Sequence, residues 1–223
     1  MFWVTCLVAA AVQPASVGHV AEKNDLCLAI AAVNIVEGEG AFFLYAQISD
    51  QAYTIQKGDR LEYDIYLPAS NPLLRGGVDA DFRRKDLSPE LDGRPWLRDH
   101  GLKDGRDLYL HGDSDLEPAR DQWYHRSFDL SRLVGVTLER WTVPFEGDRP
   151  GRYVQFLDNI RIVRDGQPVF TAYDNGPAPE VELRQVEGYS RTVLITTAPR
   201  DDAMTDKKAA EIVEEARRVN EMR

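Results

Sequence analysis

The sequence lacks the residues and motifs on which several protein classes depend. Its only cysteines, Cys6 and Cys27, exclude a disulfide framework and a cluster of cysteine metal ligands. HExxH, GxSxG, a Walker loop and a glycine-rich dinucleotide fingerprint are all missing, so no catalytic motif indicates an enzyme. Positive charge is scarce, because 27 Lys and Arg residues stand against 37 Asp and Glu. The formal charge of −10 argues against a nucleic-acid partner.

The first 16 residues are strongly apolar, and the small residues Ala15, Ser16 and Gly18 lie at or just after their end. This arrangement is typical of a secretory signal over residues 1–18, although no Lys or Arg precedes the apolar run. The alternative is a buried first strand or helix. Beyond this run no stretch is long enough for a membrane span. We therefore expect a secreted or periplasmic protein with no membrane partner after signal removal.

Short alternating segments dominate the rest of the chain. In Leu61–Leu67 every second residue is apolar, and Gly77–Phe82 repeats the pattern with Asp79 and Asp81 on its polar side. Ala21–Val33 fits either a helix or a buried strand. The remaining strand-like runs are Ala41–Ile48, Trp123–Phe128, Val136–Phe145, Tyr153–Val163, Val169–Tyr173, and the pair Val181–Val186 and Thr192–Thr197, which looks like a hairpin.

These runs predict an all-β fold. Many short strands with frequent turns, and no helices alternating with them, favour an antiparallel β-sandwich over residues 21–198, in jelly-roll form. Trp123 and Trp141 are expected in the core, with Tyr124 and Arg126 toward solvent. Thr205 or Asp206 can cap a final α-helix over residues 205–223. That helix packs on the sandwich or contacts a partner.

One acidic residue interrupts an apolar strand face. Asp158 has the same parity within Tyr153–Val163 as the apolar residues Val154, Phe156, Ile160 and Ile162. A carboxylate on such a face is costly unless backbone amides, a cation or a metal compensate it. The parity therefore predicts that Asp158 points inward and is neutralised there.

The segment from residue 83 to residue 121 is long and densely charged. A connection of this length is usually functional or disordered, and its aromatic residues argue against disorder. Sugar binding needs flat aromatic faces and fixed polar groups. The candidate ligand-binding residues are Asp79, Asp81, Trp96, Arg98, Asp99, His100, Asp104, Tyr109 and His111. Alternatively, Trp96 is a plug that anchors this loop onto the core.

Four blocks of the sequence resemble the strand blocks of galactose-binding-like jelly-roll modules: Ile55–Leu67, Gly76–Phe82, Gln122–Gly135 and Tyr153–Val163. The recurrent part is the order W-Y-H-R, F-D-L-S-x-L-x-G and then D-N-I-R-I. The resemblance covers residues 41–173 and implies a non-catalytic carbohydrate-binding domain of a secreted bacterial protein. It also implies a structural calcium site that joins Asp158 to Glu37 or Glu39, with backbone carbonyls completing the shell. The alternative for Asp158 is hydrogen bonds from backbone amides or pairing with an arginine.

The leading hypothesis is therefore a secreted, non-catalytic module that binds a glycan or polysaccharide, with no catalytic residue assigned. One alternative is a polysaccharide hydrolase or lyase on the same scaffold, since carboxylates are plentiful although no pair is singled out. The other is a structural or adhesion protein that self-associates through its terminal helix.

Overall fold

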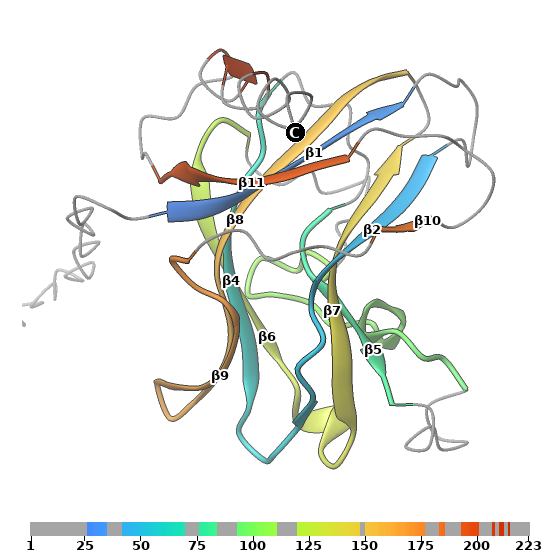
Figure 1. Cartoon of the computed structure of the whole chain (residues 1–223). Helices are drawn as coiled ribbons and strands as arrows, with labels where there is room; N and C mark the ends of the chain where they lie inside the picture. Colours follow the sequence, from blue (N-terminus) through green and yellow to red (C-terminus); the bar gives the residue numbers. More distant parts are fainter. Residues whose placement is uncertain are drawn as a thin grey trace, which may run out of the picture.

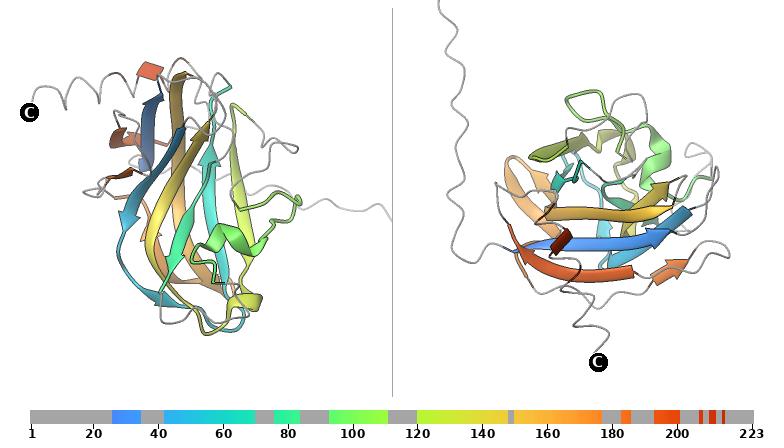
Figure 2. Two further views of the ribbon diagram at one scale, coloured as in Figure 1. Left: turned by 90° about the vertical axis from the view of Figure 1, so that its right-hand side faces the viewer. Right: turned by 90° about the horizontal axis from the view of Figure 1, so that it is seen from above.

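Two antiparallel sheets packed together form the protein, so the predicted β-sandwich is confirmed at that level (Figure 1). The computed structural model describes residues 26–34, 42–69, 76–83, 93–110, 120–147, 150–176, 183–185 and 193–200, and positions 207, 210, 211 and 214. The left view of Figure 2 looks onto the five-stranded sheet, with the strands of the other sheet behind it. Among the described residues, no helix is long and apolar enough to cross a membrane.

The described strands divide into a six-stranded and a five-stranded sheet. The first has the order β11 (Val193–Pro199), β1 (Leu26–Asn34), β8 (Gly151–Arg164), β4 (Arg60–Tyr66) and β6 (Trp123–Asp129), with β9 (Gln167–Tyr173) also paired to β8. The second has the order β10 (Leu183–Gln185), β2 (Phe42–Ser49), β7 (Thr137–Gly147) and β3 (Tyr53–Thr54), with β5 (Asp79–Phe82) also paired to β7. The described connections include the short 3₁₀ helices η3 (Leu97–His100) and η4 (Ser131–Leu133).

The main core lies between the sheets and follows the alternation read from the sequence. One face of β4 and of the β5 region contributes seven buried residues to a single apolar cluster: Leu61, Tyr63, Ile65, Leu67, Val78, Ala80 and Phe82. Trp141 of β7 is buried as predicted and stacks on Phe170 of β9, with ring centroids 5.0 Å apart. This aromatic contact joins one sheet to the other, and such pairs add to the stabilisation that apolar burial provides.

The orientation predicted for β6 is wrong. Tyr124 belongs to the main core, and Arg126 is buried beside it, whereas Trp123 packs against a second cluster. Arg126 tolerates burial because Asp104 accepts a 2.8 Å hydrogen bond from its Nε, and the carbonyls of Leu108 and Tyr109 accept from its Nη2. A buried cation with these partners avoids most of the desolvation penalty.

The parity argument for β8 fails at one point. Tyr153 and Leu157 face the main core, and Ile160 and Ile162 also belong to it. The change of parity occurs at Asn159, which has a φ of 52°, where the register with β4 shifts by a β-bulge. Asp158 is therefore buried, as predicted, but it lies on the opposite face from Ile160 and Ile162.

A second, smaller apolar cluster covers part of that opposite face. It consists of Cys27, Ala29, Ala31, Tyr66, Val154, Phe156 and Ala198, with Trp123 packed against it. Tyr66 meets the Phe156 ring edge-on at 5.9 Å and the Trp123 ring at 5.8 Å. Part of the six-stranded sheet is thus buried on both faces.

Several predictions concern segments near the two ends of the chain. The described part of Ala21–Val33, from Leu26 onward, forms strand β1 rather than a helix. The predicted hairpin is wrong, because β10 pairs with β2 in one sheet and β11 pairs with β1 in the other. Positions 207, 210, 211 and 214 are helical, and the rest of the expected 205–223 helix lies outside the described residues. The expected signal at residues 1–18 also lies outside them.

Candidate ligand-binding surface

The outer face of the five-stranded sheet carries several of the predicted ligand residues. Asp79 and Asp81 project away from the core because Ala80 and Phe82 face it. The chain then returns alongside β5. The amide of Phe82 donates to the carbonyl of Pro95 at 2.6 Å, and the backbones of Asp81 and Trp96 form an isolated antiparallel β-bridge. Backbone pairing therefore brings these distant segments together.

Arg98 occupies the centre of this surface. Its guanidinium carbon lies 4.6 Å from the ring centroid of Tyr45 on β2 and 4.5 Å from that of Trp96. The guanidinium thus contacts two aromatic rings, and the cation is attracted to the π face of each. The Trp96 side keeps a free surface, since this residue is 40% exposed.

The buried carboxylate of Asp79 binds both the side chain and the backbone of Arg98. Its Oδ2 pairs with Arg98 Nη1 at 3.2 Å, and its Oδ1 accepts from the backbone amides of Arg98 and Ala80 at 3.0 and 2.9 Å. Burial raises the pKa of Asp79 to about 7, although Arg98 and these amides act in the opposite direction. This carboxylate therefore changes its charge near neutral pH.

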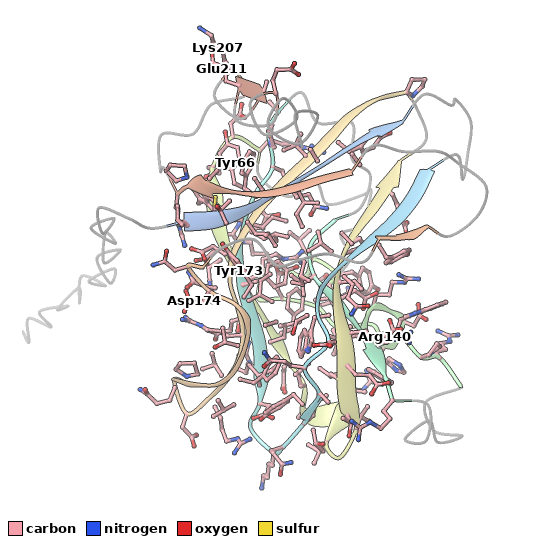
Figure 3. The ribbon with its side chains drawn as sticks, in the orientation of Figure 1. Tyr66, Arg140, Tyr173, Asp174, Lys207 and Glu211 are labelled. Atoms are coloured by element: carbon pink, nitrogen blue, oxygen red, sulfur yellow. The ribbon has the colours of Figure 1, made fainter. Side chains whose placement is uncertain are left out.

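Neighbouring charges are largely engaged in ion pairs. Asp81 pairs with Arg140 of β7, which Figure 3 shows on the side of the sheet nearest β5. Asp99 Oδ1 lies 3.8 Å from Arg98 Nε. His100 stacks on Phe82 with a centroid separation of 4.7 Å, and its Nε2 lies 3.2 Å from the carbonyl of Arg94, so it has a structural role.

Two other predicted residues belong to a different contact group. Asp104 caps its own loop by accepting hydrogen bonds from the amides of Arg106 and Leu108, and it pairs with the buried Arg126. Tyr109 is 38% exposed, with Lys103 Nζ 4.5 Å from its ring centroid. The structure therefore ties Asp104 to β6 rather than to the Trp96 surface. His111 lies outside the described residues.

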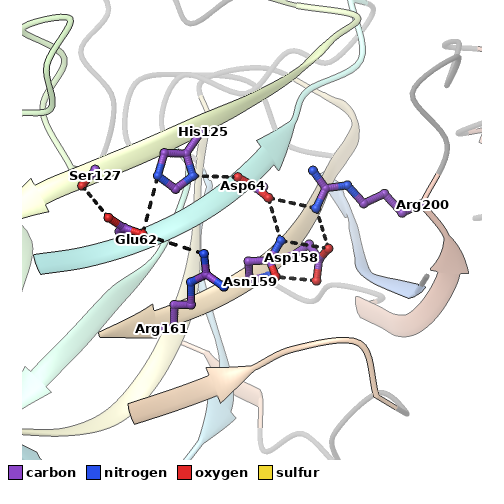
Figure 4. A network of polar contacts seen from close by, with 8 residues as sticks. All are labelled: Glu62, Asp64, His125, Ser127, Asp158, Asn159, Arg161 and Arg200. Atoms are coloured by element: carbon purple, nitrogen blue, oxygen red, sulfur yellow. Dashed lines mark hydrogen bonds and ion pairs between the residues drawn. The ribbon is translucent and has the colours of Figure 1, made fainter. Parts of the chain in front are cut away.

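Asp158 belongs to a separate polar network on the outer face of the six-stranded sheet (Figure 4). Arg200 Nη1 lies 2.7 Å from Asp158 Oδ2 and 2.8 Å from Asp64 Oδ2. Asn159 contributes its backbone amide to Asp158 at 2.8 Å and its Nδ2 to Asp64 at 2.7 Å. The Arg200 guanidinium also lies 4.7 Å from the Trp123 ring.

These contacts neutralise Asp158 with an arginine, which was one of the alternatives that the sequence left open. Glu37 and Glu39 lie outside the described residues, so the calcium site stays a prediction. No group of three or more His, Cys, Asp or Glu side chains suited to a metal ion occurs in the part of the chain that the structure describes.

The network extends to an exposed edge through His125 of β6. His125 Nδ1 bonds Asp64 at 2.8 Å, and its Nε2 lies 3.7 Å from Glu62 Oε2, which in turn is near Arg161. Sequence reasoning missed Arg200 and His125 as partners. The alternation of Leu61–Leu67 places Glu62 and Asp64 on one polar face. Two carboxylates on the same face indicate that basic side chains lie nearby, and this was the clue that the sequence offered.

A comparison of the sequence with models of known protein families finds no match, and neither does a comparison with curated proteins.

Proposed function

We propose that the protein is a secreted, non-catalytic module of the galactose-binding-like jelly-roll type that binds a glycan through the Trp96 surface. The observation that carries the proposal is the Trp96 indole, which is 40% exposed and backed on one side by Arg98. A sugar ring stacks on an exposed indole face, and fixed polar groups beside it bind hydroxyls. Asp81 and Asp99, which are partly exposed, supply acceptors next to that face.

The position of Leu97 supports a binding role for Trp96 over its alternative role as a plug. Leu97, the next residue, is fully buried in the main core and anchors this loop. Trp96 is therefore not needed as the anchor, and its exposure is left without a packing explanation. Exposed aromatic rings that are held in place are characteristic of binding surfaces.

Affinity gel electrophoresis against galactomannan, xylan and mixed-linkage β-glucan, with calcium present, tests this function. We expect retardation of the wild type by at least one polysaccharide, and about a tenfold or greater loss of affinity in Trp96→Ala. Tyr109→Ala is the matched control, because Tyr109 is similarly exposed but belongs to another contact group. Circular dichroism confirms that both variants fold. Wild type that is not retarded by any polysaccharide, or a Trp96→Ala variant with full affinity, contradicts the proposal.

A further inference from the structure

The exposed ring of Trp96 is held on one side by Arg98. An indole at the surface has two side-chain torsions, and each alternative rotamer would present a different face to a ligand. The guanidinium carbon of Arg98, 4.5 Å from the ring centroid, favours one of these orientations. A ring that is already oriented loses less conformational entropy when a ligand binds.

Arg98 is itself fixed from several elements. The ring centroid of Tyr45 on β2 lies 4.6 Å from its guanidinium carbon, and the Tyr45 hydroxyl donates to Glu146 of β7 at 3.1 Å. Asp79 of β5 pairs with its Nη1, and Asp99 approaches its Nε. The side chain of Arg98 is only 15% exposed, so these contacts act in a partly desolvated site.

Among these partners Asp79 is the fully buried one, and its charge decides how firmly the guanidinium is held. Ionised Asp79 offers two acceptor oxygens, one used by backbone amides and one by Arg98. A neutral carboxyl keeps the shape but loses the charge-assisted bond to Arg98. We propose that Arg98 is the positioning residue for the Trp96 ring, and that Asp79 regulates this binding surface through its charge. The inference rests on the glycan-binding function proposed above.

The groups that face Asp79 determine the direction of the pH effect. They are Arg98 from η3, Asp81 on β5, Tyr45 on β2 and, beyond Tyr45, Glu146 on β7. Burial raises the pKa of Asp79 to about 7, so this carboxyl is mostly ionised at pH 8 and mostly neutral at pH 6. Acidification across that interval therefore loosens Arg98 and lowers the affinity for the glycan.

The test uses full-length protein labelled with 5-fluorotryptophan, whose four tryptophans give four ¹⁹F resonances. Trp96→Phe assigns the Trp96 signal. We expect this signal to titrate between pH 8 and pH 6 in the wild type. In Arg98→Met it should move toward the position of free 5-fluorotryptophan, and Asp79→Asn should abolish its titration. Arg98→Lys retains the charge but not the planar face, so it should resemble Arg98→Met.

The affinity for galactomannan is measured in parallel in retardation gels. We expect the affinity of the wild type to fall three- to tenfold from pH 8 to pH 6, and the affinity of Asp79→Asn to stay constant over this interval. The wild-type titration needs only the Trp96→Phe assignment, so it remains decisive if Asp79→Asn fails to fold. A Trp96 resonance that is identical in wild type and Arg98→Met, or galactomannan binding that Arg98→Met leaves unchanged, overturns the proposal. Wild type that titrates as expected but is retarded by none of galactomannan, xylan and mixed-linkage β-glucan supports the coupling of Asp79, Arg98 and Trp96 and counts against the glycan function instead.

Discussion

His125 and Asp64 face each other directly across β6 and β4, with Nδ1 of the imidazole 2.8 Å from Oδ1 of the carboxylate. The hydrogen bond that the imidazole donates to Asp64 raises the pKa of His125. Burial would raise the pKa of Asp64, but hydrogen bonds from His125 and Asn159, together with Arg200, lower it to about 2. Each partner thus stabilises the charged form of the other.

The first prediction concerns the stability of this pair as a function of pH. Because the pKa of His125 is higher in the folded protein than its ordinary value of 6.5, its stabilising contribution is complete below pH 6.5. It is lost as the pH rises through the raised pKa. His125 is half exposed, so after allowance for solvent screening we expect a loss of about 0.5 kcal/mol. Urea unfolding of wild type and His125→Gln at pH 6 and pH 9 measures this loss. An unfolding free energy that changes equally with pH in both proteins contradicts the prediction.

The second prediction concerns Arg200, whose removal leaves Asp64 and Asp158 without their shared cation. Arg200→Met keeps the length of the side chain and its packing on Trp123. We expect a loss of about 3 kcal/mol in unfolding free energy, since two poorly solvated carboxylates lose the cation that they share. Adding Asp158→Asn to this variant should recover part of the loss. A stability within about 0.5 kcal/mol of wild type would show that the pairing has little energetic weight.

The third prediction separates backbone strain from hydrogen bonding at the bulge. Asn159 has a φ of 52° and donates to Asp64. Both Asn159→Ala and Asn159→Gly remove the hydrogen bond, but only alanine must also bear the left-handed backbone conformation. We therefore expect the alanine variant to be less stable than the glycine variant by about 1 kcal/mol. Equal unfolding midpoints in a thermal scan would contradict this assignment.

The fourth prediction concerns the loop that Arg126 holds against β6. Arg126→Met leaves Asp104 buried without its cation, and the carbonyls of Leu108 and Tyr109 lose their donor. We expect about 3 to 5 kcal/mol of destabilisation and faster proteolysis within residues 93–110. Arg132→Met, in the exposed arginine of η4, is the matched control and should change neither measurement. Unaltered proteolysis in Arg126→Met would show that other contacts hold the loop.

The sequence predicted the strands well where one face of a strand is uniformly apolar. Leu61–Leu67 and Gly77–Phe82 were oriented correctly because their alternation has no interruption. At β8 the alternation was misread, since a bulge adds a residue without changing the apolar character of the run. Asn159 was the available clue, because asparagine tolerates positive φ better than most residues.

Long-range pairing was beyond the reach of pattern reasoning. Arg200 is 42 positions from Asp158, and nothing in the local sequence connects them. The segments of β10 and β11 looked like a hairpin because they are close in sequence and strand-like, yet each completes a different sheet. The candidate residues Asp79, Asp81, Trp96 and Arg98 lie close together because the loop that follows β5 returns alongside it.

The bulge at Asn159 makes the length of β8 critical. Shortening the strand by that one residue would rotate everything on one side of it by half a turn relative to β4. Tyr153, Gln155 and Leu157 would then leave the space between the sheets, and Val154 and Phe156 would enter it. A single-codon deletion at this position should therefore be far more damaging than any substitution there.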